Sequence, residues 1–198
     1  MAELGSVSAA PPRPELTLPP AEAAALRAAY SAADVVLEYG SGGSTVMAAE
    51  AGAKVWAVES DAAWAQMMTA ALAGYPAQIL HVDIGPTRDW GHPQDDSHAR
   101  TWPEYCLKVW DLPDFLHPDV VLVDGRFRLG AFLTVAYRIT RPVTLFFDDY
   151  TPREAYHRAE ALARPTGIIG RMARFDLTPT PLTPDRIRAY TRALMQPV

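Results

Sequence analysis

The most informative stretch of the sequence is VVLEYGSGGST, at residues 35–45. A short apolar run stops at a glycine-rich turn, and helix-forming residues follow at about 44–51. This order is typical of a buried strand that turns sharply into a helix. Glycine permits a tight turn and lets a ligand approach the backbone. We therefore expect a ligand-binding turn over residues 40–44.

Strand and helix patterns alternate along the rest of the chain. Continuous apolar strands require cover on both faces, which favours an α/β fold with a doubly wound, mostly parallel central sheet and helices on both sides. Apolar runs predict strands at 35–39, 54–59, 78–82, 119–123, 142–147 and 167–177, and helical patterns occur at 21–30, 44–51, 61–73, 128–139, 152–164 and 184–194.

Length and proline content predict a single domain that follows an arm. The chain has 198 residues, of which 49% are hydrophobic and 21% charged, which suits one buried core. Five prolines within residues 1–20 disfavour helix and central strand, so this segment is expected to be an arm and 21–198 the domain. Residues 84–117 carry Trp90, Trp102 and Trp110 and are long for a connection, which predicts a functional lid.

Several classes of protein are disfavoured by composition. Cys106 is the only cysteine, so a disulfide scaffold and a thiolate zinc site are excluded. We expect a cytoplasmic protein without a membrane partner, because no apolar run approaches about 20 residues and no secretory signal is evident. The net charge of −5 argues against nucleic acid and leaves a small-molecule substrate. A homodimer is among the assembly states left open.

Acidic residues end the first five predicted strands. The carboxyl ends of parallel strands meet at one edge of a sheet, so these acids should converge there. Glu38 would repel a pyrophosphate and attract a cationic ligand, and Thr45 stands where a dinucleotide fingerprint needs a third glycine. Glu59 is placed to accept both ribose hydroxyls of a nucleoside, and Asp83 to read an adenine amino group.

With these residues identified, the sequence resembles the class I S-adenosylmethionine-dependent methyltransferases. Glu38, Gly40 and Gly42 match the first motif of that family, although Ser44 replaces its third glycine; Glu59 matches the second motif and Asp83 the third. The resemblance implies S-adenosylmethionine as cofactor, with its methionine part at the glycine turn. The cofactor-binding residues implied or inferred are Glu38, Tyr39, Gly40, Ser41, Gly42, Gly43, Ser44, Glu59, Ser60, Asp83, Ile84 and Asp124.

Asp124, Asp148 and Asp149 end two strands that we expect to be neighbours. They resemble the metal-binding acids of catechol-type and caffeoyl-CoA-type O-methyltransferases, which implies Mg²⁺ at these three residues and acceptor-side catalytic roles for Asp124 and Asp148. The lysine base of the catechol-type enzymes is missing. Two alternatives stay open: Arg126 or Arg128 could hold an acidic substrate, or arginines could simply neutralise the buried acids.

The predicted function is methyl transfer from S-adenosylmethionine to a small molecule, at oxygen. A methyltransferase-like module without catalysis is one alternative. An NAD-dependent oxidoreductase is another, although Glu38 and Thr45 count against it.

Overall fold

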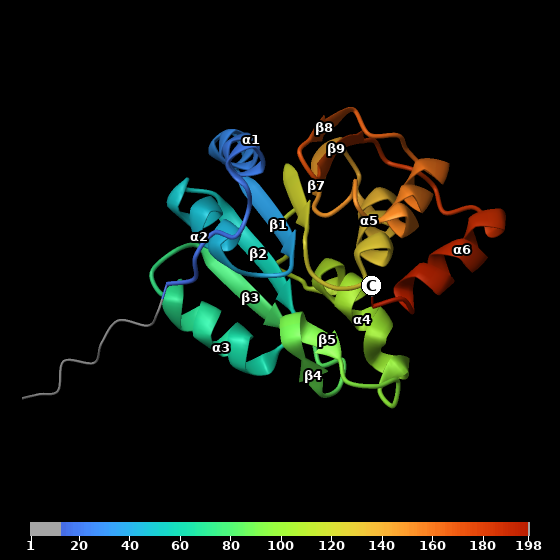
Figure 1. Ribbon diagram of the computed structural model, residues 1–198, viewed down its shortest axis with the longest axis horizontal. Helices are drawn as coiled ribbons and strands as arrows, with labels where there is room; N and C mark the ends of the chain where they lie inside the picture. The colour runs from blue at the N-terminus through green and yellow to red at the C-terminus, as the bar shows by residue number, and fades with distance from the viewer. Residues whose placement is uncertain (1–12, 198) are drawn as a thin grey trace, which may run out of the picture.

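The computed structural model describes residues 13–197 and is built around a seven-stranded sheet in the order β3-β2-β1-β6-β7-β9-β8 (Figure 1). The first five strands in this order run parallel, whereas β9 is antiparallel to β7 and β8 is antiparallel to β9. The prediction of a mostly parallel sheet is confirmed. The strands are β1 (Val35–Tyr39), β2 (Lys54–Glu59), β3 (Ala77–His81), β6 (Val120–Val123), β7 (Val143–Phe147), β8 (Gly167–Ile169) and β9 (Met172–Leu177).

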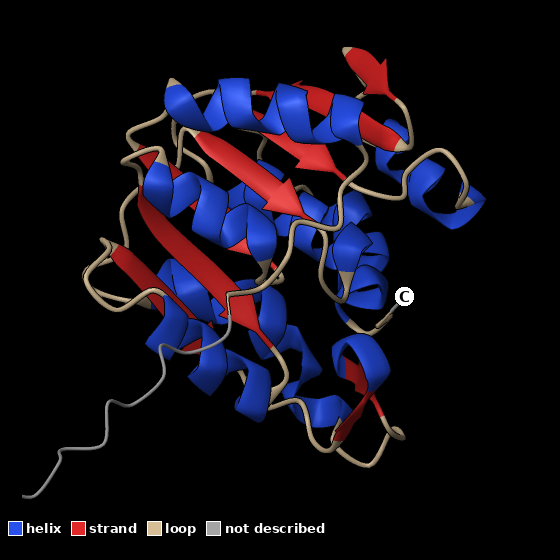
Figure 2. Ribbon diagram, turned by 60° about the vertical axis from the view of Figure 1, so that its left-hand side comes forward, coloured by secondary structure: helices blue, strands red, loops and turns tan. Residues whose placement is uncertain are grey.

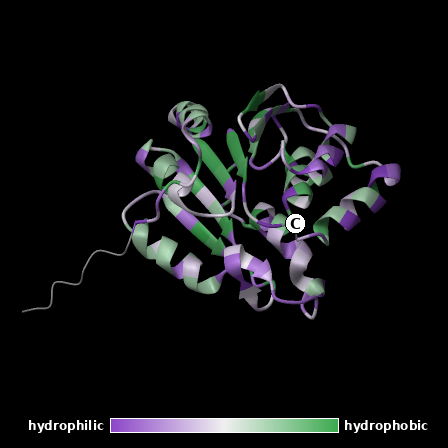
Figure 3. Ribbon diagram, viewed as in Figure 1, coloured by the Kyte–Doolittle hydropathy of each residue, from purple (hydrophilic) through white to green (hydrophobic). Residues whose placement is uncertain are grey.

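Helices cover both faces of the sheet (Figure 2). Successive strand residues point to opposite faces, so Val36 packs with α1, α2 and α3, while Leu37 packs with α4 and α5. The strands accordingly form the hydrophobic middle layer (Figure 3). The helices are α1 (Pro20–Ser31), α2 (Gly43–Glu50), α3 (Ala62–Ala71), α4 (Trp102–Leu107), α5 (Arg128–Arg138) and α6 (Pro184–Leu194).

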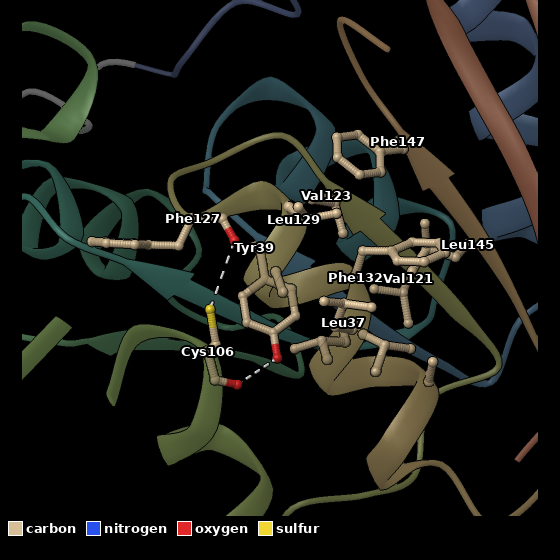
Figure 4. Close-up of a cluster of buried hydrophobic side chains, with 14 of the residues drawn as sticks. Leu37, Tyr39, Cys106, Val121, Val123, Phe127, Leu129, Phe132, Leu145 and Phe147 are labelled. Atoms are coloured by element: carbon tan, nitrogen blue, oxygen red, sulfur yellow. Dashed lines mark hydrogen bonds between the residues drawn. The ribbon is translucent and has the colours of Figure 1, made fainter. Parts of the chain in front are cut away.

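The larger core cluster lies between the sheet and the layer formed by α4 and α5. Tyr39 is fully buried there and donates its hydroxyl to the carbonyl of Cys106 at 2.8 Å (Figure 4). The Cys106 thiol lies 3.8 Å from the Phe127 carbonyl oxygen, and burial raises its pKa well above the ordinary range. Cys106 is therefore an inert core residue rather than a nucleophile.

Two predicted elements differ in the structure. The expected strand at 167–177 is a hairpin, β8 and β9, because Gly170 adopts a φ of +56° and reverses the chain. The expected helix at 152–164 is the 3₁₀ helix η4 (Glu154–Ala161). The other predicted elements are present with ends shifted by at most two residues.

The connection at 84–117 folds into a small ribbon followed by helical turns. The ribbon pairs β4 (Thr87–Arg88) with β5 (His92–Pro93) across η1 (Asp89–Gly91), and η2 (Ala99–Thr101), α4 and η3 (Lys108–Asp111) follow. Trp102 is buried in the core, whereas Trp90 is 83% exposed. Only part of the expected lid therefore faces solvent.

The predicted arm falls partly outside the described residues, at 1–12. Residues 13–19 contain no helix or strand, and Leu18 is buried against the smaller core cluster. Over residues 13–197, no helix is long and apolar enough to cross a bilayer.

Candidate functional site

A cavity of about 760 Å³ opens at the carboxyl ends of the parallel strands. Its walls come from the turn after β1, the ends of β2, β6 and β7, the 90–92 segment and residues 14–18. Strand order reverses between β1 and β6, and this switch point is where doubly wound sheets bind ligands. Its volume suits a small ligand.

The glycine turn after β1 is shaped by a close approach between two strand ends. Gly40 has a φ of +100°, and a Cβ added there would lie 2.9 Å from the Gly125 Cα. A Cβ on Gly125 would in turn collide with the Tyr105 hydroxyl. Both positions therefore require glycine, and together they bring the ends of β1 and β6 against one cavity.

Glu38 supports this turn from beneath. Its carboxylate is fully buried and accepts hydrogen bonds from Tyr30 at 2.5 Å, Thr45 at 2.5 Å and Ser44 at 3.2 Å. Burial raises the pKa of Glu38 to about 7, against the effect of these hydrogen bonds. Glu38 is not part of the cavity wall. Its placement therefore supports positioning of the turn instead of the direct contact with a cationic ligand that the sequence suggests.

Glu59 is the acid that faces the cavity from β2. Oε1 accepts the backbone amides of Ser60 at 2.7 Å and Asp61 at 3.1 Å, and Oε2 accepts the Ser41 hydroxyl at 2.8 Å. Four bonds to neighbouring groups fix its direction, counting the weaker 3.5 Å contact from the Ser60 hydroxyl. Such a held carboxylate can accept hydrogen bonds from a ribose diol.

The remaining predicted cofactor residues divide into two groups. Gly40, Ser41, Gly42, Gly43, Ser44, Ser60 and Asp124 all line the cavity with Glu59. Tyr39, Asp83 and Ile84 do not. Tyr39 and Ile84 point into the core, and the Asp83 carboxylate accepts the Gly85 amide at 2.9 Å outside the cavity.

Arg128 joins the ends of β6 and β7 from a nearly buried position, with 4% exposure. Its guanidinium donates to the carbonyls of Gly125 at 3.0 Å, Asp124 at 3.0 Å and Asp148 at 2.8 Å. It also pairs with the carboxylates of Asp124 at 3.0 Å and Asp149 at 3.2 Å. Every nitrogen of this side chain has a partner, which identifies a structural clamp.

The three aspartates do not fit the predicted Mg²⁺ site. Arg171 binds both oxygens of Asp148, with its Nη2 2.8 Å from Oδ2, and Asp149 is shared by Arg128, Arg153 and Arg171. Across residues 13–197, no cluster of three or more His, Cys, Asp or Glu side chains is arranged to hold a metal ion. Guanidinium groups supply the positive charge that a metal would otherwise provide, so the arginine-neutralisation alternative describes this site.

Asp124 keeps one face toward the cavity, with 31% of its side chain exposed. Burial raises its pKa to about 7; nearby Asp148 and Asp149 raise it further, whereas Arg128 lowers it. A carboxylate poised near neutral pH can take or give a proton. Asp148 also lines the cavity, but it is only 1% exposed and its carboxylate is held by Arg171.

Arg126 differs from every other arginine of the site. It is 6% exposed and its Nε, within residues 13–197, has no hydrogen-bond partner. Nη1 contacts Nε2 of His92, whose pKa falls to about 4 because of burial and then the charge of Arg126. His92 is therefore neutral at pH 7 and leaves the charge of Arg126 unbalanced.

Three non-glycine residues with positive φ stand at or beside the cavity. They are Trp90 at 62°, Phe127 at 50° and Asp149 at 55°. Left-handed backbone is unfavourable for such residues and is retained mainly where the site needs it. Phe127 buries its own ring in the core and sends Arg126 and Arg128 in different directions.

Sequence reasoning missed several residues of this cavity. Arg171 follows the unrecognised hairpin turn, and His92 lies in the 84–117 connection. Trp64 donates its indole N–H to the Ser41 carbonyl at 2.8 Å, and Leu16 packs on Gly43. The aromatic character of 84–117 was the only signal that pointed toward His92; nothing in the sequence marks Arg171, Trp64 or Leu16.

No protein-family model and no curated protein matches the chain. Among solved structures it is similar to a methyltransferase-like protein from Silicibacter pomeroyi, with 53% identity and a TM-score of 0.88 over 93% of this chain and 99% of that one. A SAM-dependent methyltransferase from Agrobacterium tumefaciens matches at 14% identity and a TM-score of 0.41, over 80% and 63% of the two chains. A 16S rRNA methyltransferase from T. thermophilus, in complex with AdoMet and guanosine, matches at 14% identity and 0.42, over 80% and 41%. At 53% identity over nearly the whole of both chains, the protein belongs to the family of methyltransferase-like proteins.

Proposed function

We propose that the protein transfers a methyl group from S-adenosylmethionine to an oxygen atom of a small molecule. The observation that carries this proposal is the Glu59 carboxylate, held by two backbone amides and Ser41, beside the glycine turn and facing a cavity of about 760 Å³. Membership of the methyltransferase-like family supports the methyl-transfer part of this proposal. When bound, S-adenosylmethionine supplies a methyl group on a sulfonium, which a nucleophile can displace.

The two halves of the cavity have separate tasks in this proposal. Glu59, Ser60 and the backbone of the glycine turn bind the nucleoside and the amino-acid part of the cofactor, and Glu38 holds that turn in shape. On the other half, Asp124 accepts the proton of the acceptor hydroxyl. Its raised pKa suits this task, because a base works best when its pKa lies near the working pH.

Asp148 and its arginine act as positioning residues. Asp148 forms an ion pair with Arg171 and lies beside Asp124, where it is one cause of the raised Asp124 pKa. Asp124 is therefore the catalytic acid–base residue, and Asp148 positions it and its charge.

Calorimetric titration of S-adenosylhomocysteine tests the cofactor half. Glu59→Gln should weaken binding by about 10- to 100-fold, because hydrogen bonds to a charged group contribute roughly 1.5–3 kcal/mol. Exposed Glu154→Gln is the matched control and should bind like the wild type. A parallel titration of NAD addresses the oxidoreductase alternative.

The outcomes separate the three functions. No binding of S-adenosylhomocysteine to folded wild-type protein would overturn the proposal, and binding of NAD instead would favour the oxidoreductase. Tight cofactor binding without methyl transfer to any acceptor in a broad small-molecule screen would favour the non-catalytic module.

A further inference from the structure

Among the described residues, Arg126 is a buried cation without a counter-ion in a cavity where every other arginine has one. Arg128, Arg153 and Arg171 each pair with Asp124, Asp148 or Asp149. Within residues 13–197, no carboxylate lies within 4 Å of the Arg126 guanidinium, and its Nε has no partner. An unpaired charge in such a position is costly unless a ligand completes it.

The surroundings of Arg126 do not compensate its charge. Burial lowers its pKa, and the charge of Arg128 lowers it further. His92 accepts one hydrogen bond from Arg126 but supplies no negative charge. Burial, and then the charge of Arg126, lower the pKa of His92 to about 4, so the imidazole is neutral at pH 7. The Tyr105 hydroxyl accepts the backbone N–H of Arg126 at 3.2 Å and fixes the main chain, not the guanidinium.

The local chain conformation aims Arg126 into the cavity. Phe127, at a φ of 50°, separates it from Arg128, so one guanidinium returns to the strand ends while the other reaches the 90–92 segment. Left-handed backbone at a phenylalanine is expensive. The cost is explained if the free guanidinium has a ligand to bind.

We propose that the acceptor carries an anionic group, a carboxylate or a phosphate, and that Arg126 binds this group. The inference rests on the proposed methyl transfer. Asp124 and Arg126 are two residues apart on one turn and both line the cavity, so one small molecule can present a hydroxyl to the first and an anion to the second. The acceptor class is therefore a hydroxylated carboxylic acid or a phosphate ester. The planar guanidinium fork suits either anion.

Arginine Nε–H signals in ¹H–¹⁵N spectra of the full chain provide a local test. Sodium acetate and inorganic phosphate are the probes, and sodium chloride at equal ionic strength is the control. The Arg126 signal, assigned by its loss in Arg126→Met, should shift saturably with acetate, phosphate or both. The Arg128 signal is the internal reference and should not move, because its donors are already occupied. The anion that binds more tightly, acetate or phosphate, identifies the anionic group of the acceptor. A shift with neither anion would overturn the proposal.

The cofactor itself has a carboxylate, so a second arm assigns the source of the anion. Saturation with S-adenosylhomocysteine should leave anion binding at Arg126 intact. If S-adenosylhomocysteine blocks the anion while 5′-methylthioadenosine, which lacks the carboxylate, does not, Arg126 serves the cofactor and the acceptor assignment is wrong. Absence of S-adenosylhomocysteine binding is visible in the same spectra and would count against the proposed function alone.

A matched pair of variants separates direct contact from the general field of the cavity. Arg126→Met should lower the affinity for the more tightly bound anion by about 10- to 100-fold, as the loss of a hydrogen bond to a charged group predicts. Arg153→Met removes the same charge from the same cavity but takes it from a residue paired with Asp149, and should change the affinity by less than about threefold. Equal losses in both variants would overturn a direct role for Arg126.

Discussion

At the scale of the residue, the site depends on two arginines that are two positions apart and do opposite things. Arg128 satisfies three carbonyls and two carboxylates, whereas Arg126 leaves a donor unused. The sequence offered both as candidates for either task. Which one turns inward depends on the backbone of Phe127 between them, and no sequence pattern marks that residue as left-handed.

The two arginines should respond oppositely to the same substitution. Arg128→Met should lower the free energy of unfolding by about 3–5 kcal/mol, because it removes the ion-pair partner of Asp124 and the donors of three backbone carbonyls. Arg126→Met should leave it unchanged or raise it, since an apolar side chain replaces an unpaired buried charge. Urea denaturation measures both. Arg141→Met, which breaks an exposed pair with Asp119, is the control and should cost less than about 1 kcal/mol. A large loss in Arg126→Met would contradict the assignment of its charge as unpaired.

Some residues of the site could be found from sequence because a pattern fixes where they lie. Glu59 ends an apolar strand and does face the cavity. Glu38 ends the preceding strand of the chain in the same way, yet it is covered by Tyr30, Ser44 and Thr45. Position at a strand end predicts the edge of the sheet that a residue occupies. It does not predict which neighbouring hydroxyls cover it, because Tyr30 comes from another helix.

At the scale of the element, the turn before α2 packs closely against residues 15–16. A Cβ on Gly43 would lie 2.5 Å from the Glu15 carbonyl oxygen and the Leu16 Cα, whereas one on Gly42 would meet no atom within 4 Å among the described residues. The φ of Gly42 is 173°, which is extended backbone open to any residue. Close packing therefore requires glycine at 43, whereas the described residues leave room for a side chain at 42.

This difference predicts different stabilities for two neighbouring alanine variants. Gly43→Ala should displace residues 14–18 and lower the free energy of unfolding by about 1–3 kcal/mol. It should also weaken the binding of S-adenosylhomocysteine, because residues 14–18 line the cavity. Gly42→Ala should keep the wild-type stability. Thermal melting followed by calorimetric titration checks both. Equal stability of the two variants would show that the 14–18 segment yields without cost.

Elements were predictable wherever a mainly apolar run ended at a clear turn or helix start, as in β1 and β2. The hairpin of β8 and β9 was read as one strand, because Gly170 sits inside a run whose apolar content continues past the turn. A glycine in a strand pattern signals a bulge or a reversal. The antiparallel partner that stabilises the reversal is β7, which sequence periodicity alone does not pair with β9.

At the scale of the whole molecule, two acids with raised pKa values connect stability to pH. The pKa of Asp124 rises from 3.8 to about 7 and that of Glu38 from 4.5 to about 7, in both cases mainly through burial. Between about pH 4 and pH 7 the folded state therefore binds more protons at these groups than the unfolded state. Their contribution to stability is present at low pH and is lost as the pH rises through about 7.

Asp124→Asn should therefore gain stability relative to the wild type as the pH rises, because the asparagine never has to ionise. The difference in unfolding free energy between variant and wild type should be smallest near about pH 4, should favour the variant increasingly up to about pH 7, and should level off above that pH. Urea denaturation at several pH values measures this difference. Asp114→Asn, the same substitution at an exposed aspartate, is the control. A gain that shrinks with rising pH would contradict the raised pKa of Asp124.

The clamp formed by Arg128 has a consequence for how a ligand meets this protein. The ends of β6 and β7 and the start of α5 are tied together by the protein's own groups before any ligand arrives. Ordering a flexible side chain on binding typically costs about 0.5–1.5 kcal/mol, and a preorganised wall avoids that cost. The acceptor half of the cavity is thus preorganised. Affinity there depends on the shape and charge of the acceptor more than on rearrangement of the protein.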